Sequence, residues 1–129
     1  MRVSARLRKG YAHTVTFEHH TLIVDEPEEV GGADTGPRPG ALLAMSLAAC
    51  TAITVEMYAD RKGWDVGDLE VDVDYEPDPK GTSRFDVVVK VPASLSAEQV
   101  DGLRVVASKC PVHRVLMGDV EIEDRVEVG

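Results

Sequence analysis

The chain contains only two cysteines, and both stand where a thiol could react. Cys50 lies in the uncharged run 47–54, where apolar neighbours at helical spacing fit an inert core thiol as well as a reactive one. Cys110 directly precedes Pro111, at the expected start of a helix, where backbone N–H groups stabilise a thiolate. Two thiols that meet in the fold would support disulfide chemistry.

A metal site is a weaker alternative. Cys110 and His113 form a Cys-x-x-His pair, which is typical of half a zinc site. Cys50, or the adjacent His19 and His20, would have to complete it, and no second closely spaced pair is present. Because the two neighbouring histidines fall at an expected hairpin tip, we expect no metal and no cofactor.

Alternation of apolar and polar residues with a period of two predicts the strands. Residues 18–21 are typical of a tight hairpin connection, and residues 25–40, rich in Pro, Gly and acidic side chains, are typical of a loop. The expected strands cover residues 3–7, 15–17, 22–24, 69–75, 85–91 and 120–128.

Three helical segments are expected between these strands. Residues 40–62 contain no proline, follow Pro39 and end in Arg61, Lys62 and Gly63, which predicts a helix of about 24 residues. Residues 96–99 match a capping box, so a second helix begins there. Pro111 interrupts that helix, and a short third segment runs to residue 117. The elements together predict an α+β fold.

The first helix indicates a homodimer. About 24 residues span about 36 Å at 1.5 Å per residue, which matches the whole diameter of a compact chain of this size. Its stretch 41–55 is apolar or small on nearly every side and therefore needs burial all round. One short helix and a small sheet cannot cover it, whereas a second copy of the chain can.

Composition limits the class of protein. With 129 residues, 43% hydrophobic and 29% charged, the chain is expected to form a single domain over residues 1–129. A net charge of −9 opposes nucleic acid as a partner. The N-terminus lacks the apolar core of a signal peptide, and the uncharged run 39–55 is shorter than a membrane span. We therefore expect no membrane partner and a cytoplasmic location, where thiols stay reduced.

Several of these stretches together resemble the OsmC/Ohr superfamily, the osmotically induced and organic hydroperoxide resistance proteins. The stretches that carry the resemblance are residues 36–39, 42–43, 49–54, 57–64 and 109–114. The resemblance covers essentially the whole chain. It implies the OsmC-like fold, an intertwined homodimer in which two central helices pack on sheets built from both chains.

The resemblance also implies chemistry. In its peroxidase members, the cysteine corresponding to Cys50 attacks an organic hydroperoxide as a thiolate. The cysteine corresponding to Cys110 then resolves the sulfenic acid to a disulfide, which an external dithiol reduces. The expected catalytic residues are therefore Cys50 and Cys110, in a thiol-dependent peroxidase of the oxidative stress response. An apolar pocket between subunits is expected to include Leu43, Leu47, Ile53 and Met57.

One position departs from the peroxidase pattern. Those members usually carry a glutamate directly after the proline that opens the long helix, and this chain has Gly40 there. The glutamate holds an arginine near the reactive sulfur, for which Arg6, Arg8 and Arg38 are all candidates here. The alternative function is therefore a catalytically weak or inactive OsmC-like dimer that binds a small apolar ligand.

Overall fold

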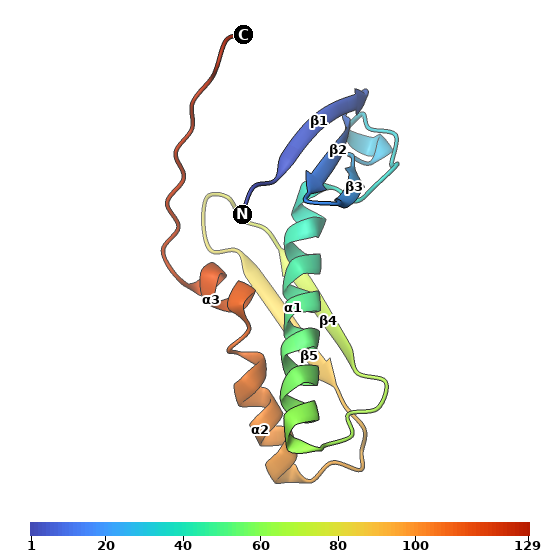
Figure 1. Cartoon of the computed structure of the whole chain (residues 1–129), viewed down its shortest axis with the longest axis vertical. Helices are drawn as coiled ribbons and strands as arrows, with labels where there is room; N and C mark the ends of the chain where they lie inside the picture. Colours follow the sequence, from blue (N-terminus) through green and yellow to red (C-terminus); the bar gives the residue numbers. More distant parts are fainter. The chain divides into compact units, whose positions relative to one another are not determined.

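The computed structural model describes residues 1–129 and contains three α-helices and five strands (Figure 1). Contacts divide the chain into two units, residues 1–45 with 76–83 and residues 46–75 with 84–129. The expectation that residues 1–129 form a single domain therefore stays a prediction. The elements are β1 (Ser4–Lys9), β2 (Ala12–Phe17), β3 (His20–Val24), a 3-10 turn η1 (Glu28–Val30), α1 (Pro39–Lys62), β4 (Glu70–Glu76), β5 (Arg84–Lys90), α2 (Ala97–Ala107) and α3 (Pro111–Met117).

The first unit contains an antiparallel sheet with the strand order β1-β2-β3, made of the three strands that the alternating pattern predicts in this part of the chain. The hairpin between β2 and β3 turns at Glu18, whose φ is 52°. After β3 the loop is fixed by Asp25, which is only 2% exposed. Its carboxylate accepts bonds from the Thr35 hydroxyl at 2.7 Å, the Thr35 N–H at 3.1 Å and the Glu26 N–H at 2.8 Å. These bonds, that of the Thr35 hydroxyl above all, lower the pKa of Asp25.

The core of the second unit lies along one face of α1. The buried side chains of this helix are four residues apart, so they form a single stripe: Leu47, Thr51, Val55 and Ala59. Val55 and Ala59 pack with Val66 and Leu103, which brings α2 against α1. The helix ends where the sequence predicts, because Gly63 follows with a φ of 71°, a conformation that suits glycine.

The entry to α2 and α3 also follows the sequence. The Ser96 hydroxyl accepts the Gln99 N–H at 3.1 Å, while the Gln99 side chain accepts the Ser96 N–H at 2.8 Å, which completes the capping box. Pro111 then occupies the first turn of α3, with Cys110 as its N-cap. The prediction that proline ends one helix and opens another is confirmed.

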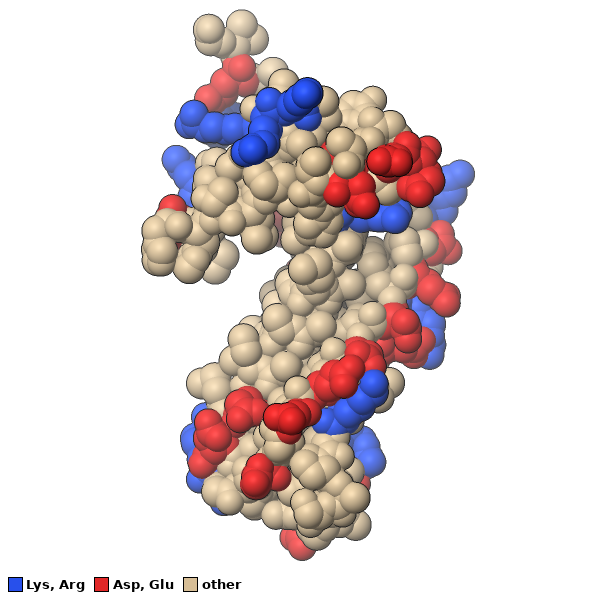
Figure 2. All heavy atoms as spheres, turned by 90° about the vertical axis from the view of Figure 1, so that its right-hand side faces the viewer, with Lys and Arg blue, Asp and Glu red and all other residues tan.

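β4 and β5 form a two-stranded sheet with a charged outer side. The Lys90 ammonium contacts Asp72 at 2.7 Å and Glu70 at 3.5 Å across the two strands. Figure 2 shows acidic side chains spread over one face of the molecule, several of them beside a Lys or Arg. This face offers no broad basic area to a polyanion.

The strand predicted over residues 120–128 is wrong for the single chain. Residues 118–129 have no regular secondary structure, and all of them are exposed. The apolar positions still alternate with charged ones, but a strand needs a neighbour to satisfy its N–H and C=O groups, and none is paired with this segment. The sequence pattern is therefore present without the pairing that would make it a strand.

The outer side of α1 is apolar and exposed. Met45, Ile53 and Met57 are 53%, 59% and 56% exposed. By length and composition alone this helix is long and apolar enough to cross a membrane, with a mean hydropathy of 1.6 over its most apolar stretch. The core helix of a soluble protein meets the same criterion, so this property does not identify a membrane segment.

Candidate active site

The two cysteines, 60 positions apart in the chain, meet in the second unit. Cys50 lies near the middle of α1, and Cys110 caps the N-terminus of α3. Their thiols lie close enough for each to shift the pKa of the other, and both are free. The residues around Pro111 position Cys110, because the break between α2 and α3 turns its side chain toward α1.

The two sulfurs differ in exposure. Cys110 is completely buried, whereas Cys50 is half-buried and open to solvent on one side. Cys110 Sγ accepts the His113 N–H at 3.4 Å. In the single chain, Cys50 is therefore the more accessible of the two cysteines.

The same contacts shift the two thiol pKa values in opposite directions. Burial and the adjacent Cys110 sulfur raise the pKa of Cys50, against weaker bonds from the Val112 N–H and the Thr54 hydroxyl. Burial also opposes ionisation of Cys110, but bonds from Cys50, the His113 N–H and the Thr51 hydroxyl outweigh it and lower the pKa of Cys110. Loss of a proton from the pair is therefore easier at Cys110 than at Cys50.

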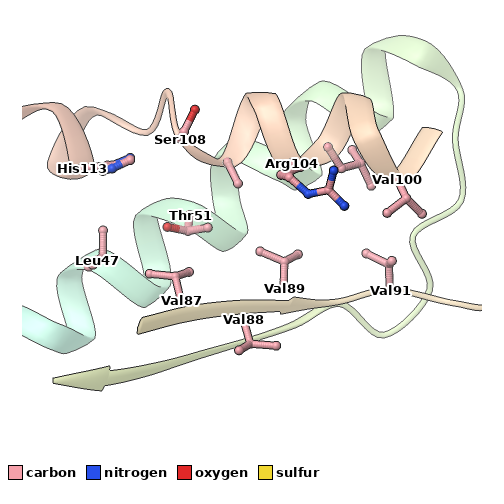
Figure 3. Close-up of a pocket in the computed structure, with 12 residues that line it drawn as sticks. Leu47, Thr51, Val87, Val88, Val89, Val91, Val100, Arg104, Ser108 and His113 are labelled. Atoms are coloured by element: carbon pink, nitrogen blue, oxygen red, sulfur yellow. The ribbon is translucent and has the colours of Figure 1, made fainter. Parts of the chain in front are cut away.

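A cavity of about 420 Å³ lies beside the pair, between α1, α2 and β5. Neither cysteine lines the cavity, but Thr51 and His113 do, and the His113 backbone N–H bonds to Cys110 Sγ. Figure 3 shows Val87 and Val89 of β5, and Val91 just after it, facing the helices, with Val88 pointing the other way. Apart from Thr51, Arg104, Ser108 and His113, the lining is apolar: Leu47, Val87, Val88, Val89, Val91, Val100, Leu103 and Ala107.

The predicted apolar pocket between subunits stays a prediction, and of its four residues only one lines this cavity within the single chain. Leu47 lines it, whereas Leu43, Ile53 and Met57 do not and are exposed on α1. The sequence analysis missed the β5 valines, Arg104 and His113 as lining residues. The period-two pattern of β5 marks which valines share a face, but not that α2 and α3 would lie opposite them.

The other candidate residues lie outside this pair. Arg6 and Arg8 are on β1 and Arg38 precedes α1, all of them exposed in the first unit. His19 and His20 contact each other at the β2–β3 hairpin, with ring centroids 4.1 Å apart. No group of three or more His, Cys, Asp or Glu side chains is arranged to hold a metal ion.

The sequence model of the family described as OsmC-like protein matches residues 31–124, which include both cysteines and the whole of α1, α2 and α3. The chain belongs to the OsmC-like protein family. The resemblance to the OsmC/Ohr superfamily noted in the sequence is thereby confirmed. No functionally curated protein matches the chain.

Solved structures of OsmC/Ohr proteins share the α+β fold. An OsmC-like protein from Mycoplasma pneumoniae is 22% identical, with a TM-score of 0.76 over 91% of this chain and 86% of that one. The organic hydroperoxide resistance protein OsmC of Legionella pneumophila is 21% identical, with a TM-score of 0.63 over 92% and 90%. The organic hydroperoxide resistance protein OhrB of Bacillus subtilis is 26% identical, with a TM-score of 0.60 over 93% and 92%.

Proposed function

We propose that this OsmC-like protein is a thiol-dependent peroxidase that reduces organic hydroperoxides through Cys50 and a Cys50–Cys110 disulfide. The observation that carries the proposal is the contact between the only two sulfurs that can form such a disulfide, one open to solvent and one buried. Similarity to proteins named for organic hydroperoxide resistance supports the substrate class.

The proposed reaction balances with the two thiols and one peroxide. The Cys50 thiolate attacks the terminal peroxide oxygen, so the S–O bond forms as the O–O bond breaks and the alkoxide leaves. Sulfur is oxidised to a sulfenic acid, and the alkoxide takes a proton to become the alcohol. Cys110 then attacks the Cys50 sulfur and releases water, which leaves the disulfide for an external dithiol to reduce.

The test is a stoichiometric oxidation of the reduced protein. One equivalent of cumene hydroperoxide is expected to consume both thiols and to yield an internal disulfide, which peptide mass spectrometry locates between Cys50 and Cys110. Dihydrolipoamide is then expected to restore both thiols and to support turnover. Two free thiols after this treatment would contradict the proposal.

The cavity beside the pair is proposed to bind the organic part of the hydroperoxide. Replacing Val100, one of its lining residues on α2, by Glu is expected to raise KM for cumene hydroperoxide about tenfold, because about 1.5 kcal/mol of apolar contact is lost. The rate with hydrogen peroxide should change much less. Val105→Glu adds the same charge to an exposed position of the same helix and serves as the control; equal effects of the two variants on KM would argue against this site.

A cytoplasmic homodimer is part of the proposal. The exposed apolar side of α1 supports a second copy as its cover, because soluble monomers rarely leave large contiguous apolar patches in water. The alternating segment 120–128 supports sheets completed by the partner chain. The protein's excess of acidic residues argues against nucleic acid as a partner. The proposed partners are the hydroperoxide, the external dithiol and the second copy of the chain.

A second candidate function is a weak or inactive dimer that binds a small apolar ligand. Two observations favour it: Gly40 stands in the first turn of α1, where peroxidase members usually have a glutamate, and burial raises the pKa of Cys50. It predicts that the thiols survive hydroperoxide while the cavity still binds an apolar dye such as ANS. The oxidation experiment above separates the two functions.

A further inference from the structure

His113 is the residue of the Cys-x-x-His pair to which the proposed reaction gives no role. The spacing that is typical of half a zinc site has another basis in this fold, because Cys110 is the N-cap of α3 and its sulfur accepts the His113 backbone N–H at 3.4 Å. That bond uses the main chain of His113 and not its imidazole ring. The side chain of His113 instead lines the cavity that is proposed to bind the organic part of the hydroperoxide (Figure 3).

His113 lies at the end of this cavity that adjoins the cysteines. Figure 3 shows it at the same end as Leu47 and Thr51 of α1. Cys50 lies between these two residues in the helix, so its turn of α1 borders that end of the cavity. Cys110 is bonded to the backbone of His113 itself. Both cysteines therefore lie beside the part of the cavity wall to which His113 belongs.

We propose that the His113 imidazolium donates a proton to the alkoxide that leaves when Cys50 attacks the hydroperoxide. This role rests on the proposed peroxidase function. With the organic group in the cavity and the terminal oxygen turned toward Cys50, the departing oxygen is the one bonded to the organic group. It therefore lies at the end of the cavity that adjoins the cysteines, within reach of the His113 ring.

The chemistry of the polar lining residues favours histidine as the proton donor. The cavity has four such residues: Thr51, Arg104, Ser108 and His113. The Arg104 guanidinium bonds to Asp101 at 2.6 Å, and arginine keeps its protons near neutral pH. The Ser108 hydroxyl donates to the Val105 carbonyl at 2.7 Å. A threonine hydroxyl donates a hydrogen bond but also keeps its proton, whereas histidine holds and releases a proton near neutral pH.

Atoms and charges balance in the proposed step. The Cys50 thiol first loses its proton to solvent. The thiolate then forms the S–O bond as the O–O bond breaks, which oxidises sulfur to the sulfenic acid and reduces the peroxide. A proton passes from the imidazolium to the departing oxygen, so the products are the sulfenic acid, an alcohol and a neutral imidazole. Because His113 is only half-buried, its ring regains a proton from solvent before the next turnover.

Two peroxides that differ in the leaving group test the proton donation. Cumene hydroperoxide releases an alkoxide, which needs a proton, whereas perbenzoic acid, an aromatic peroxide of similar size, releases benzoate, which does not. In His113→Asn and His113→Gln, consumption of cumene hydroperoxide by excess reduced protein is expected to slow on the order of 10²-fold. Consumption of perbenzoic acid should stay close to the native rate. Both variants keep the backbone N–H that bonds to Cys110.

The ratio of the two rates separates proton donation from a structural role of His113. Both peroxides need the Cys50 thiolate and space for an aromatic group, so a substitution that disturbed the thiol or the cavity would slow both reactions alike. His20→Asn removes an exposed histidine at the start of β3 and should keep the native ratio. A native ratio in both His113 variants, whether the two rates are unchanged or equally reduced, would overturn the proposed role.

Failure of the peroxidase function gives a different result. A native protein that consumes neither peroxide would contradict that function, and the role of His113 with it. One that consumes perbenzoic acid but not cumene hydroperoxide would also contradict both, because the proposed donor is present and yet does not assist an alkoxide. A native protein that consumes both peroxides, at a ratio that His113→Asn leaves unchanged, would keep the peroxidase function and overturn only the proton donation.

Discussion

Replacing Cys50 by Ser is expected to abolish hydroperoxide reduction, with a loss of at least about 10³-fold in turnover. A serine hydroxyl is not oxidised by a peroxide, so the S–O bond of the first step has no counterpart. The substitution keeps the size and polarity of a half-buried side chain on α1, and we expect the fold to persist. The measurement is the consumption of cumene hydroperoxide with dihydrolipoamide as reductant.

The matched variant is Cys110→Ser, which removes the other sulfur of the same pair. It is expected to consume one equivalent of hydroperoxide slowly and then stop, with Cys50 trapped as a sulfenic acid. The two serine variants therefore differ in stoichiometry, zero against one, although neither turns over. Full turnover by the Cys50→Ser protein would show that the peroxide reacts elsewhere.

The parts of the fold that depend on neighbours in sequence could be predicted. The bounds of α1 follow from Pro39 and Gly63, and the capping box at Ser96 follows from its own side chains. The N-cap position of Cys110 follows from Pro111. In each case one or two residues determine the backbone conformation locally, through a restricted φ or a specific hydrogen bond, so no distant contact is needed.

The contact between the cysteines was expected from the family resemblance rather than from the residues alone. Composition and spacing fit an inert core thiol at Cys50 as well as they fit a reactive one. The segment that carries Cys110 is positioned by the packing of α2 against α1, in which Leu103 and Val55 meet in the core, 48 positions apart in sequence. The unequal burial of the two sulfurs depends on the same packing and has no marker in the sequence.

The cavity and the Asp25 loop show the same limit. Val89 has the pattern of an inward strand residue, yet its role as a cavity wall arises because Arg104 and His113 lie across from it. Asp25 belongs to a run of acidic residues that composition assigns to solvent, but it is 2% exposed because Thr35 folds back onto it. A run of acidic residues in the sequence does not show which carboxylate is solvated and which is buried and accepts the hydrogen bonds that fix the loop.

Placing a charge on the exposed apolar side of α1 is expected to convert the proposed homodimer into monomers. Ile53 is 59% exposed in the single chain and lies between Met45 and Met57 in sequence, which are also more than half exposed. In a symmetric dimer, Ile53→Glu buries two unpaired carboxylates, at a cost of several kcal/mol in all. A cost of about 4 kcal/mol corresponds to about a 10³-fold weaker dimer.

Light scattering after size-exclusion chromatography at micromolar concentration measures the effect as mass. Thr82→Glu, which adds the same charge in the exposed loop between β4 and β5, is the control and should remain dimeric. The monomeric variant is also expected to melt at a lower temperature, because the free energy of association no longer stabilises the fold. A native protein that is monomeric, or an Ile53→Glu protein that stays dimeric, would mean that something other than a second copy covers this face of α1.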